Sequence, residues 1–263
     1  MDAKTALEGF YGAYNEEDRF APKHGQVEFL TTMRYIARFL KPDMRILEIG
    51  AGTGRYSRAI AKMGYSVDAI ELIQSNIDRF SALIEEGTDV RVWQGDALNL
   101  SGLADGAYDL VLLLGPMYHL FTPEDQRQAF SEALRVLAPG GTLMTAYCLM
   151  DASILVHGFV RGYIFDLIGK NMVDTDHFIA RSNPEDIFQL WRKEDIDALN
   201  AHFPVRRLHY VATDLAANYI HDTIDAMDEK TFAMYLRYHF TICERPDLVG
   251  ASHHVLDILR KEG

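Results

Sequence analysis

The sequence predicts an α/β fold, with a doubly wound, mainly parallel sheet and helices on both of its faces. Two observations carry this prediction. Short apolar runs alternate with stretches of helical periodicity from about residue 45 to residue 148. One of these runs, Tyr108 to Leu114, is apolar almost throughout, as expected of a strand that is buried on both faces of a parallel sheet.

The predicted elements follow one another in a regular order. Apolar residues at three- and four-residue steps from Val27 to Leu40 predict an amphipathic helix, which Pro42 closes off. The run Thr122 to Asp125 supplies an N-cap, a proline at the first helical position and an acidic first turn for a later helix. Strands are expected near residues 45–49, 66–70, 90–94, 108–114 and 142–148, with helices near 55–63, 74–86 and 123–137 between them.

Beyond residue 148 the pattern changes to a helix-rich stretch that reaches about residue 202. A sixth strand is expected at Val205 to Val211, and the chain closes with a last strand at His254 to Arg260. Two insertions, near residues 149–185 and 214–250, would lie above the carboxyl ends of the strands, where open α/β sheets bind ligands. The predicted divisions are an N-terminal helical segment or lid (1–41), a binding core (42–148), a helical insertion (149–204) and the end of the core sheet with a helical cap (205–263).

The residues after the first strand indicate a loop for a nucleotide-like ligand. Gly50, Gly52 and Gly54 stand at alternate positions, and glycine lets the backbone turn sharply and approach a ligand without a Cβ. A dinucleotide fingerprint is disfavoured, because its third small residue would fall on Arg55 or Ser57. A phosphate loop is disfavoured as well, because no Gly-Lys-Ser/Thr follows the glycines.

Acidic residues stand at fixed places around this loop. Glu48 precedes the glycines, Glu71 ends the second strand, and Gly95-Asp96-Ala97 ends the third. The turn before the fifth strand reads Leu-x-Pro-Gly-Gly at residues 137–141. In this order and spacing, these features resemble the class I S-adenosylmethionine (SAM)-dependent methyltransferases.

The resemblance implies a Rossmann-like, seven-stranded, mainly parallel sheet. The spacing in this chain adds helical cap insertions after strands five and six, where the family has a short connection between its last two strands. It implies SAM as the cofactor and S-adenosylhomocysteine as its product, with the ribose hydroxyls on Glu71 and the adenine on Asp96 and the next backbone N–H. The cofactor-binding residues that it predicts are Glu48, Gly50, Ala51, Gly52, Gly54, Glu71, Leu72, Gly95, Asp96, Ala97 and Leu114.

Composition restricts the partners. The formal net charge is −12, which disfavours a nucleic acid partner because affinity for phosphate backbones needs clustered cations. The two cysteines, Cys148 and Cys243, form neither a disulfide framework nor a metal pattern, which favours a reducing cytoplasm. We expect no signal peptide and no membrane span, since no apolar stretch approaches about 20 residues.

The residues after the fourth strand are the predicted catalytic ones. In related folds this loop faces the transferring methyl group, and here it carries Tyr118 and His119. We predict His119 as a general base or substrate ligand and Tyr118 as an orienting residue. The loop lacks both the Asn/Asp-Pro-Pro-Tyr motif of nucleic acid and glutamine amide methyltransferases and the aspartate of magnesium-dependent catechol-type enzymes, because Gly115 and Pro116 stand there. No metal is therefore expected.

Aromatic, imidazole and cationic side chains outside the core are the predicted substrate-binding residues. A segment before the first helix could fold over the cofactor as a lid and exclude water, and the insertions could line an acceptor pocket. Packing within an ordinary helical cap remains an equal interpretation for each of them. The residues are Tyr11, Tyr14, Arg19, His157, Tyr235 and His239.

The sequence thus predicts a SAM-dependent methyltransferase that acts on a small molecule by in-line displacement, as a monomer or a homodimer. A protein or RNA methyltransferase is the nearest alternative. A non-catalytic SAM-binding regulator is the second, because a fold alone does not establish turnover.

Overall fold

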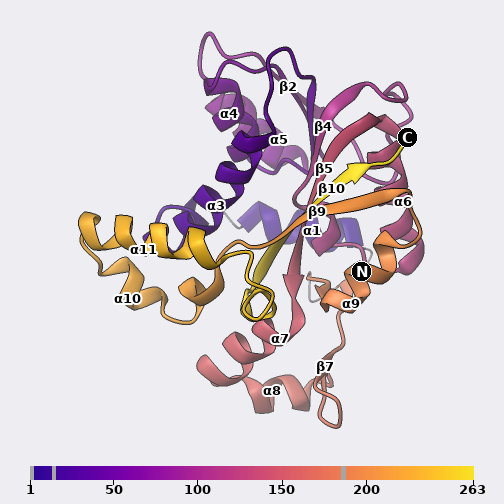
Figure 1. Cartoon of the computed structure of the whole chain (residues 1–263). Coiled ribbons are helices and arrows are strands. Elements are labelled where there is room, and N and C mark those ends of the chain that lie inside the picture. The colour runs from indigo at the N-terminus through magenta and orange to yellow at the C-terminus, as the bar shows by residue number, and fades with distance from the viewer. Residues whose placement is uncertain (1–2, 14–15, 185–187) are drawn as a thin grey trace.

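The computed structural model describes residues 3–13, 16–184 and 188–263 (Figure 1). Its centre is a sheet in the order β3-β2-β1-β4-β5-β10-β9, with β8 paired to the end of β5. Strands β1 to β5 pair in parallel, and β10 is antiparallel to both of its neighbours. The sheet contains β1 (Ile46–Ile49), β2 (Val67–Glu71), β3 (Val90–Gln94), β4 (Tyr108–Leu113), β5 (Leu137–Leu149), β8 (Leu190–Trp191), β9 (Val205–Ala212) and β10 (His254–Lys261).

The helices of the core lie where the sequence predicts them. Thr122 begins the third connecting helix, because its hydroxyl accepts a hydrogen bond from the backbone N–H of Asp125 at 3.1 Å. The N-terminal helices are α1 (Ala3–Ala13), α2 (Glu16–Arg19) and α3 (Lys23–Phe39), and the connecting helices are α4 (Arg55–Lys62), α5 (Gln74–Leu83) and α6 (Pro123–Val136).

Alternate residues of β4 face opposite sides of the sheet and so divide the hydrophobic core into two layers. Leu110 and Leu112 pack in the layer that holds Tyr35 of α3 and Ile60 of α4. On the other side lie Val111 and Leu113, in the layer that contains apolar residues of α6 and of α9 (Lys193–Asn200). Helices therefore cover both faces, as predicted.

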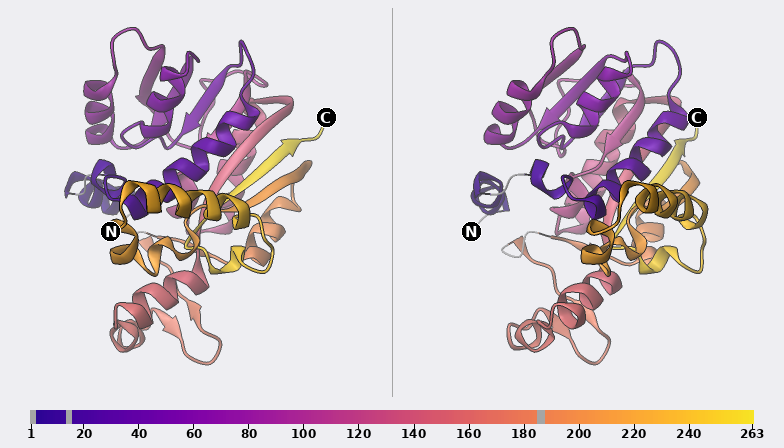
Figure 2. Two further views of the ribbon diagram at one scale, coloured as in Figure 1. Left: turned by 60° about the vertical axis from the view of Figure 1, so that its left-hand side comes forward. Right: turned by 90° about the vertical axis from the view of Figure 1, so that its left-hand side faces the viewer.

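The segment after β5, predicted as a helix-rich insertion, also contains short strands that were not predicted. It contains α7 (Met150–Ser153), the π-helical turn η2 (Ile154–Val160) and α8 (Ile164–Gly169), but also the two-residue strands β6 (Val173–Asp174) and β7 (Ile179–Ala180). The strand β8 then adds an eighth strand to the central sheet. Strands of two residues are too short to carry an alternating pattern, so the sequence does not reveal them. Figure 2 shows this segment as a lobe that projects from the end of the sheet.

The last two long strands form the predicted antiparallel pair, from Val255 opposite Ala212 to Lys261 opposite Val205. Between them the chain is helical, as predicted, with η4 (Leu215–Asn218), α10 (His221–Asp225), α11 (Glu229–Ile242) and η5 (Val249–Ala251). The short helix η1 (Pro116–Tyr118) follows β4. Within the described ranges, no helix combines the length and apolar character that crossing a membrane requires.

Candidate active site

One large cavity opens at the carboxyl ends of the parallel strands. Its volume is about 1300 Å³, which exceeds the roughly 300–1,000 Å³ of a typical pocket for one small ligand. The strand ends β1 to β5 contribute residues to its wall, and so do α1, α3, the lobe after β5 and the start of β10. The cavity therefore has room for two small molecules side by side.

The glycine loop after β1 forms part of this wall. Gly50, Gly52 and Gly54 have φ angles of 72°, 55° and 75°, a region that L side chains rarely adopt. Gly50 and Gly52 line the cavity, together with Ala51. Gly54 is not among the described lining residues, and a Cβ placed on it would meet the ring of Phe80 at 2.2 Å. Position 54 therefore requires glycine because the loop packs closely against α5.

Two of the three predicted carboxylates, Glu48 and Glu71, are buried at the cavity wall and hold the loop in place. Glu71, 6% exposed, accepts hydrogen bonds from the backbone N–H of Gly52 at 2.8 Å and of Ile73 at 3.0 Å. Glu48, 2% exposed, accepts from the backbone N–H and the hydroxyl of Ser57 at the start of α4. Both carboxylates line the cavity.

The ends of β3 and β4 supply the remaining predicted cofactor residues. Asp96 follows β3, and its Oδ1 accepts from the backbone N–H of Leu98 at 2.9 Å, which fixes the turn. At Gly95, a Cβ would meet Ile70 at 2.6 Å, so the close approach of β3 and β2 requires glycine. Leu72, Ala97 and Leu114 also line the cavity, after β2, β3 and β4 respectively.

Tyr118 and His119 lie on the cavity wall after β4, as the sequence predicts. Burial raises the pKa of Tyr118 well above its ordinary value, so its hydroxyl stays protonated. Nε2 of His119 lies 3.0 Å from the hydroxyl of Tyr11 in α1, and Phe188 packs beside the imidazole ring at a centroid distance of 5.5 Å. Three distant segments of the chain therefore meet at His119.

The predicted substrate residues divide into three groups. Tyr11, Arg19 and His157 line the cavity, and burial lowers the pKa of His157. Tyr235 and His239 are not among the described lining residues, which corrects the expectation that they face the acceptor. They lie in α11, where Tyr235 packs against a cluster around Phe232 and His239 is 1% exposed. Tyr14 lies outside the described residues.

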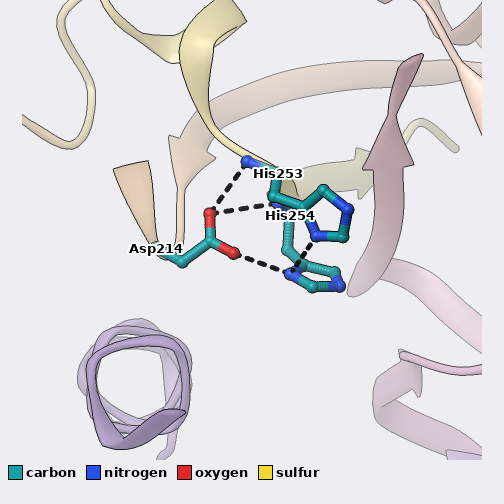
Figure 3. Close-up of side chains that lie close together, drawn as sticks. All are labelled: Asp214, His253 and His254. Atoms are coloured by element: carbon teal, nitrogen blue, oxygen red, sulfur yellow. Dashed lines mark hydrogen bonds and ion pairs between the residues drawn. The ribbon is translucent and has the colours of Figure 1, made fainter. Parts of the chain in front are cut away.

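A cluster of ionisable residues at the cavity was not found from the sequence. His253 and His254 line the cavity at the start of β10, and Asp214 lies directly behind them after β9 (Figure 3). Glu28 of α3 also lines the cavity and pairs with Arg19. The adjacent histidines were the only visible signal, because the carboxylates come from positions 28 and 214, far away in the sequence.

Charge coupling in this cluster is strong. Burial alone would raise the pKa of Asp214, but His254 lies next to it and holds that pKa well below its usual range. Burial alone would lower the pKa of His254, but the charges of Glu28 and Asp214 raise it above its ordinary value. For His253, burial and the neighbouring His254 lower the pKa. The cavity wall therefore includes an ionisable cluster in addition to the glycine loop.

Comparison with known proteins identifies the core. The profile of a family described as "Methyltransferase domain" matches residues 46–141. A ubiquinone biosynthesis O-methyltransferase from Rickettsia felis is 25% identical over 182 residues, 67% of this chain and 71% of that protein. A probable tRNA methyltransferase 9B from Mus musculus is 31% identical over 116 residues, 42% of this chain and 23% of that protein.

Solved structures share the fold. A SAM-dependent methyltransferase from Thermotoga maritima, described as a possible histamine N-methyltransferase, superposes with a TM-score of 0.60. It is 19% identical, and the alignment covers 98% of this chain and 99% of the other. Residues 46–141 thus form a methyltransferase domain, and this match, the relatives and the shared fold together support a class I SAM-dependent methyltransferase with S-adenosylmethionine as its cofactor.

Proposed function

We propose that this methyltransferase acts on a small-molecule acceptor. The observation that carries the proposal is one cavity of about 1300 Å³ whose wall combines two chemically different sets of residues. One set consists of the glycine loop and the ends of β2 and β3. The other consists of Arg19, Glu28 and the two histidines at the start of β10. A cofactor and a small acceptor fit such a cavity side by side.

The hydrogen-bond acceptors beside the glycine loop suit an adenosyl cofactor. We assign the ribose hydroxyls to Glu71 and the adenine amino group to Asp96, because a carboxylate accepts hydrogen bonds from both kinds of donor. Gly50, Ala51 and Gly52 offer backbone at the wall, and Leu72, Ala97 and Leu114 offer apolar contact. When bound, SAM supplies an electrophilic methyl group, so the protein mainly positions and desolvates the reactants.

Residues 1–41 suit the role of a lid, and we propose this role for them. Leu7, Phe10 and Tyr11 of α1 reach the cavity wall. The contact between Tyr11 and His119 links α1 to the loop after β4. We assign His119 to acceptor binding and Tyr118 to orientation of the acceptor, since both line the cavity after β4. Closure of α1 would exclude water from the reaction.

A small acceptor is favoured over a nucleic acid. The net charge of −12 opposes a phosphate backbone, and the relative named for tRNA matches only 42% of this chain. The Rickettsia relative, named for ubiquinone biosynthesis, matches 67% of it. The lobe after β5 also covers the cavity with His157, Tyr163 and Ile154, which suits an organic molecule of limited size. Cytoplasmic location and oligomeric state stay predictions from the sequence.

Titration calorimetry and label transfer test this proposal. The purified protein should bind SAM and S-adenosylhomocysteine in the micromolar range. Incubation with methyl-labelled SAM and a metabolite extract should then move label into a low-mass product. Label in protein or RNA instead would establish the macromolecular alternative. Binding without any transfer would favour a regulator, and absence of binding would contradict the assigned cofactor site.

A further inference from the structure

Asp214 fixes the ring of His254 by a hydrogen bond at the start of β10. Its Oδ2 lies 2.7 Å from Nδ1 of His254, and Asn218 donates to the same oxygen at 2.6 Å. Its Oδ1 accepts from the backbone N–H of His253 at 3.0 Å and of His254 at 3.1 Å (Figure 3). Because Asp214 is 2% exposed and accepts from these four donors, it holds the Nδ1–H form of the His254 ring in one orientation.

This arrangement leaves Nε2 of His254 as the nitrogen that can accept. Arg19 lies 3.2 Å from Nε2, and because a guanidinium has donors and no acceptor, this contact fits a lone pair on Nε2; a proton from the acceptor would replace the contact. His254 and Arg19 both line the cavity. The ring of Tyr118, which we assign to the acceptor, lies 6.1 Å from that of His254 by centroid.

The charges around His254 favour uptake of one proton. Glu28 and Asp214 are both buried carboxylates, and Nδ1 of His254 lies 3.4 Å from Oε2 of Glu28. With neutral histidines, the two carboxylates outnumber the single guanidinium of Arg19 by one charge. A proton on His254 makes the group neutral, and a buried group with balanced charge costs less than one with an excess charge.

We propose that His254 is the residue that takes the proton from the acceptor, with Asp214 as its positioning residue. The acceptor is then a small molecule whose nucleophilic oxygen or nitrogen carries a proton, such as a phenol or a protonated amine. This proposal rests on the proposed function. The bond between the acceptor atom and its hydrogen breaks, and the proton moves to Nε2. The electron pair left on the acceptor atom forms the bond to the methyl carbon, and the pair of the broken carbon–sulfur bond stays on sulfur.

Every charged or titratable neighbour of His254 enters its pH dependence. The carboxylates raise its pKa, and Arg19 lowers it, as the balance of the cluster indicates. His253 lies beside it with the ring centroids 4.4 Å apart. The groups that face it are Arg19 of α2, Glu28 of α3, Tyr118 of η1, Cys148 of β5, Asp214 after β9, and His253.

A metal ion is the competing occupant. One ligand atom from each of Asp214, His253 and His254 lies within 4.8 Å of the others. The oxygens of Asp214 already accept from five donors, however, since the hydroxyl of Ser252 also donates to Oδ1 at 2.6 Å, and Arg19 places a cation beside His254. The hydrogen bonds therefore favour the proton, and metal binding becomes an outcome of the test.

Nitrogen-15 NMR of the histidine rings tests the proposal without any acceptor. At alkaline pH, His254 should show Nδ1–H and an unprotonated Nε2, and Nε2 should gain a proton on acidification with a pKa above the ordinary value of about 6.5. Asp214→Asn should lower that pKa by roughly 1 to 2 units. The opposite tautomer, no titration between about pH 5 and pH 10, or displacement of the signal by stoichiometric Zn²⁺ would each overturn the proposal.

Kinetics separate this role from cofactor binding. His254→Asn keeps a donor toward Asp214 but lacks Nε2. With catechol or phenethylamine as the probe acceptor, this variant should bind SAM normally but lose about 10²- to 10⁴-fold in kcat. The acid limb of its pH profile should disappear as well. Asp214→Asn should lose a smaller factor in kcat than His254→Asn, and the acid limb of its pH profile should shift to lower pH. The control, His209→Asn, breaks a similar histidine–carboxylate pair on β9, outside the cavity.

Failure of the two proposals is distinguishable. A wild-type protein that does not bind SAM contradicts the proposed function, whatever the state of His254. Normal SAM binding with an unchanged kcat and pH profile in His254→Asn overturns the role of His254 alone. If neither probe is methylated, the tautomer and the response to Asp214→Asn still decide whether His254 can accept a proton.

Discussion

The backbone N–H of Gly52 donates a hydrogen bond to Oε2 of Glu71 across 2.8 Å. This contact joins the glycine loop after β1 to the end of the neighbouring strand β2. The other oxygen of Glu71 accepts from Ile73 and Asn76 at the start of α5. The carboxylate that we assign to the ribose is therefore held rigidly before any ligand arrives, and it also shapes the loop that surrounds it.

Two replacements of Glu71 should weaken SAM binding to different extents. Glu71→Gln keeps the shape and one acceptor oxygen but loses the charge, and Glu71→Ala loses both. We expect Glu71→Ala to cost about 1.5 to 3 kcal/mol in binding free energy, as for other hydrogen bonds to charged groups, and Glu71→Gln to cost less. Calorimetric titration with SAM measures both values.

The control for Glu71 is Asp78→Asn, which removes an exposed carboxylate on α5. This variant should bind SAM as the wild type does. Unchanged affinity in Glu71→Ala would contradict the assignment of this residue to the ribose. A loss that accompanies unfolding at the assay temperature would instead locate the effect in the loop, so the thermal midpoint of each variant is measured as well.

The binding core could be predicted because its signals are local. Glu48, the glycines and Glu71 each stand at the end of an apolar strand, and parallel strands bring their carboxyl ends to one edge. The cluster of Glu28, Asp214 and His254 could not be predicted, because three separate elements bring these side chains together. The same reason applies to α11. The apolar stripe of a helix does not reveal which neighbouring element the helix packs against, and His239 of α11 is not among the described residues that line the cavity.

Gly54→Ala should destabilise the fold and loosen the loop. Gly54 has a φ of 75°, and the new Cβ would meet the ring of Phe80 at 2.2 Å. We expect overpacking to lower the free energy of unfolding by about 1 to 3 kcal/mol, in addition to the strain of an alanine at positive φ. Urea unfolding measures the free energy, and SAM titration measures the effect on the neighbouring loop.

Gly64→Ala is the matched control for Gly54. Gly64 also has a positive φ, 92°, but a Cβ there would meet no atom within 4 Å. Its replacement should show the cost of backbone strain alone. Phe80→Leu should recover part of the loss in Gly54→Ala, because it removes ring atoms that collide with the new methyl group. Equal losses at the two glycines would exclude the collision with Phe80 as a cause.

Tyr11 and His119 should affect acceptor binding more than the chemical step. Tyr11→Phe removes the hydroxyl that lies 3.0 Å from Nε2 of His119. A neutral hydrogen bond contributes about 0.5 to 1.5 kcal/mol, so we expect the acceptor KM to rise roughly 2- to 12-fold in Tyr11→Phe and His119→Gln. The kcat should change little, and SAM affinity should be unaffected.

Steady-state kinetics with the acceptor found by label transfer checks this prediction. Tyr238→Phe serves as control, because Tyr238 is 59% exposed on α11 and does not line the cavity in the described residues. A loss of more than about 100-fold in kcat for His119→Gln, with an unchanged KM, would make His119 the general base and would remove that role from His254.

Acid should destabilise the protein through His239. Burial lowers the pKa of this side chain from 6.5 to about 4. The folded state therefore holds His239 neutral, while the unfolded chain takes up a proton below about pH 6.5. Above pH 6.5 the protonation of His239 does not affect the free energy of unfolding. Between about pH 6.5 and pH 4 the stability falls progressively, by about 2 kcal/mol at pH 5, and below pH 4 the loss levels off.

Urea unfolding of His239→Leu at about pH 8 and pH 5 measures this contribution. The variant should lose less stability than the wild type between the two pH values, because leucine does not titrate. His202→Leu is the control, since His202 is exposed after α9 and its removal should leave the pH dependence as it is. If wild type and His239→Leu lose the same free energy on acidification, another group carries the acid sensitivity and the lowered pKa of His239 is wrong.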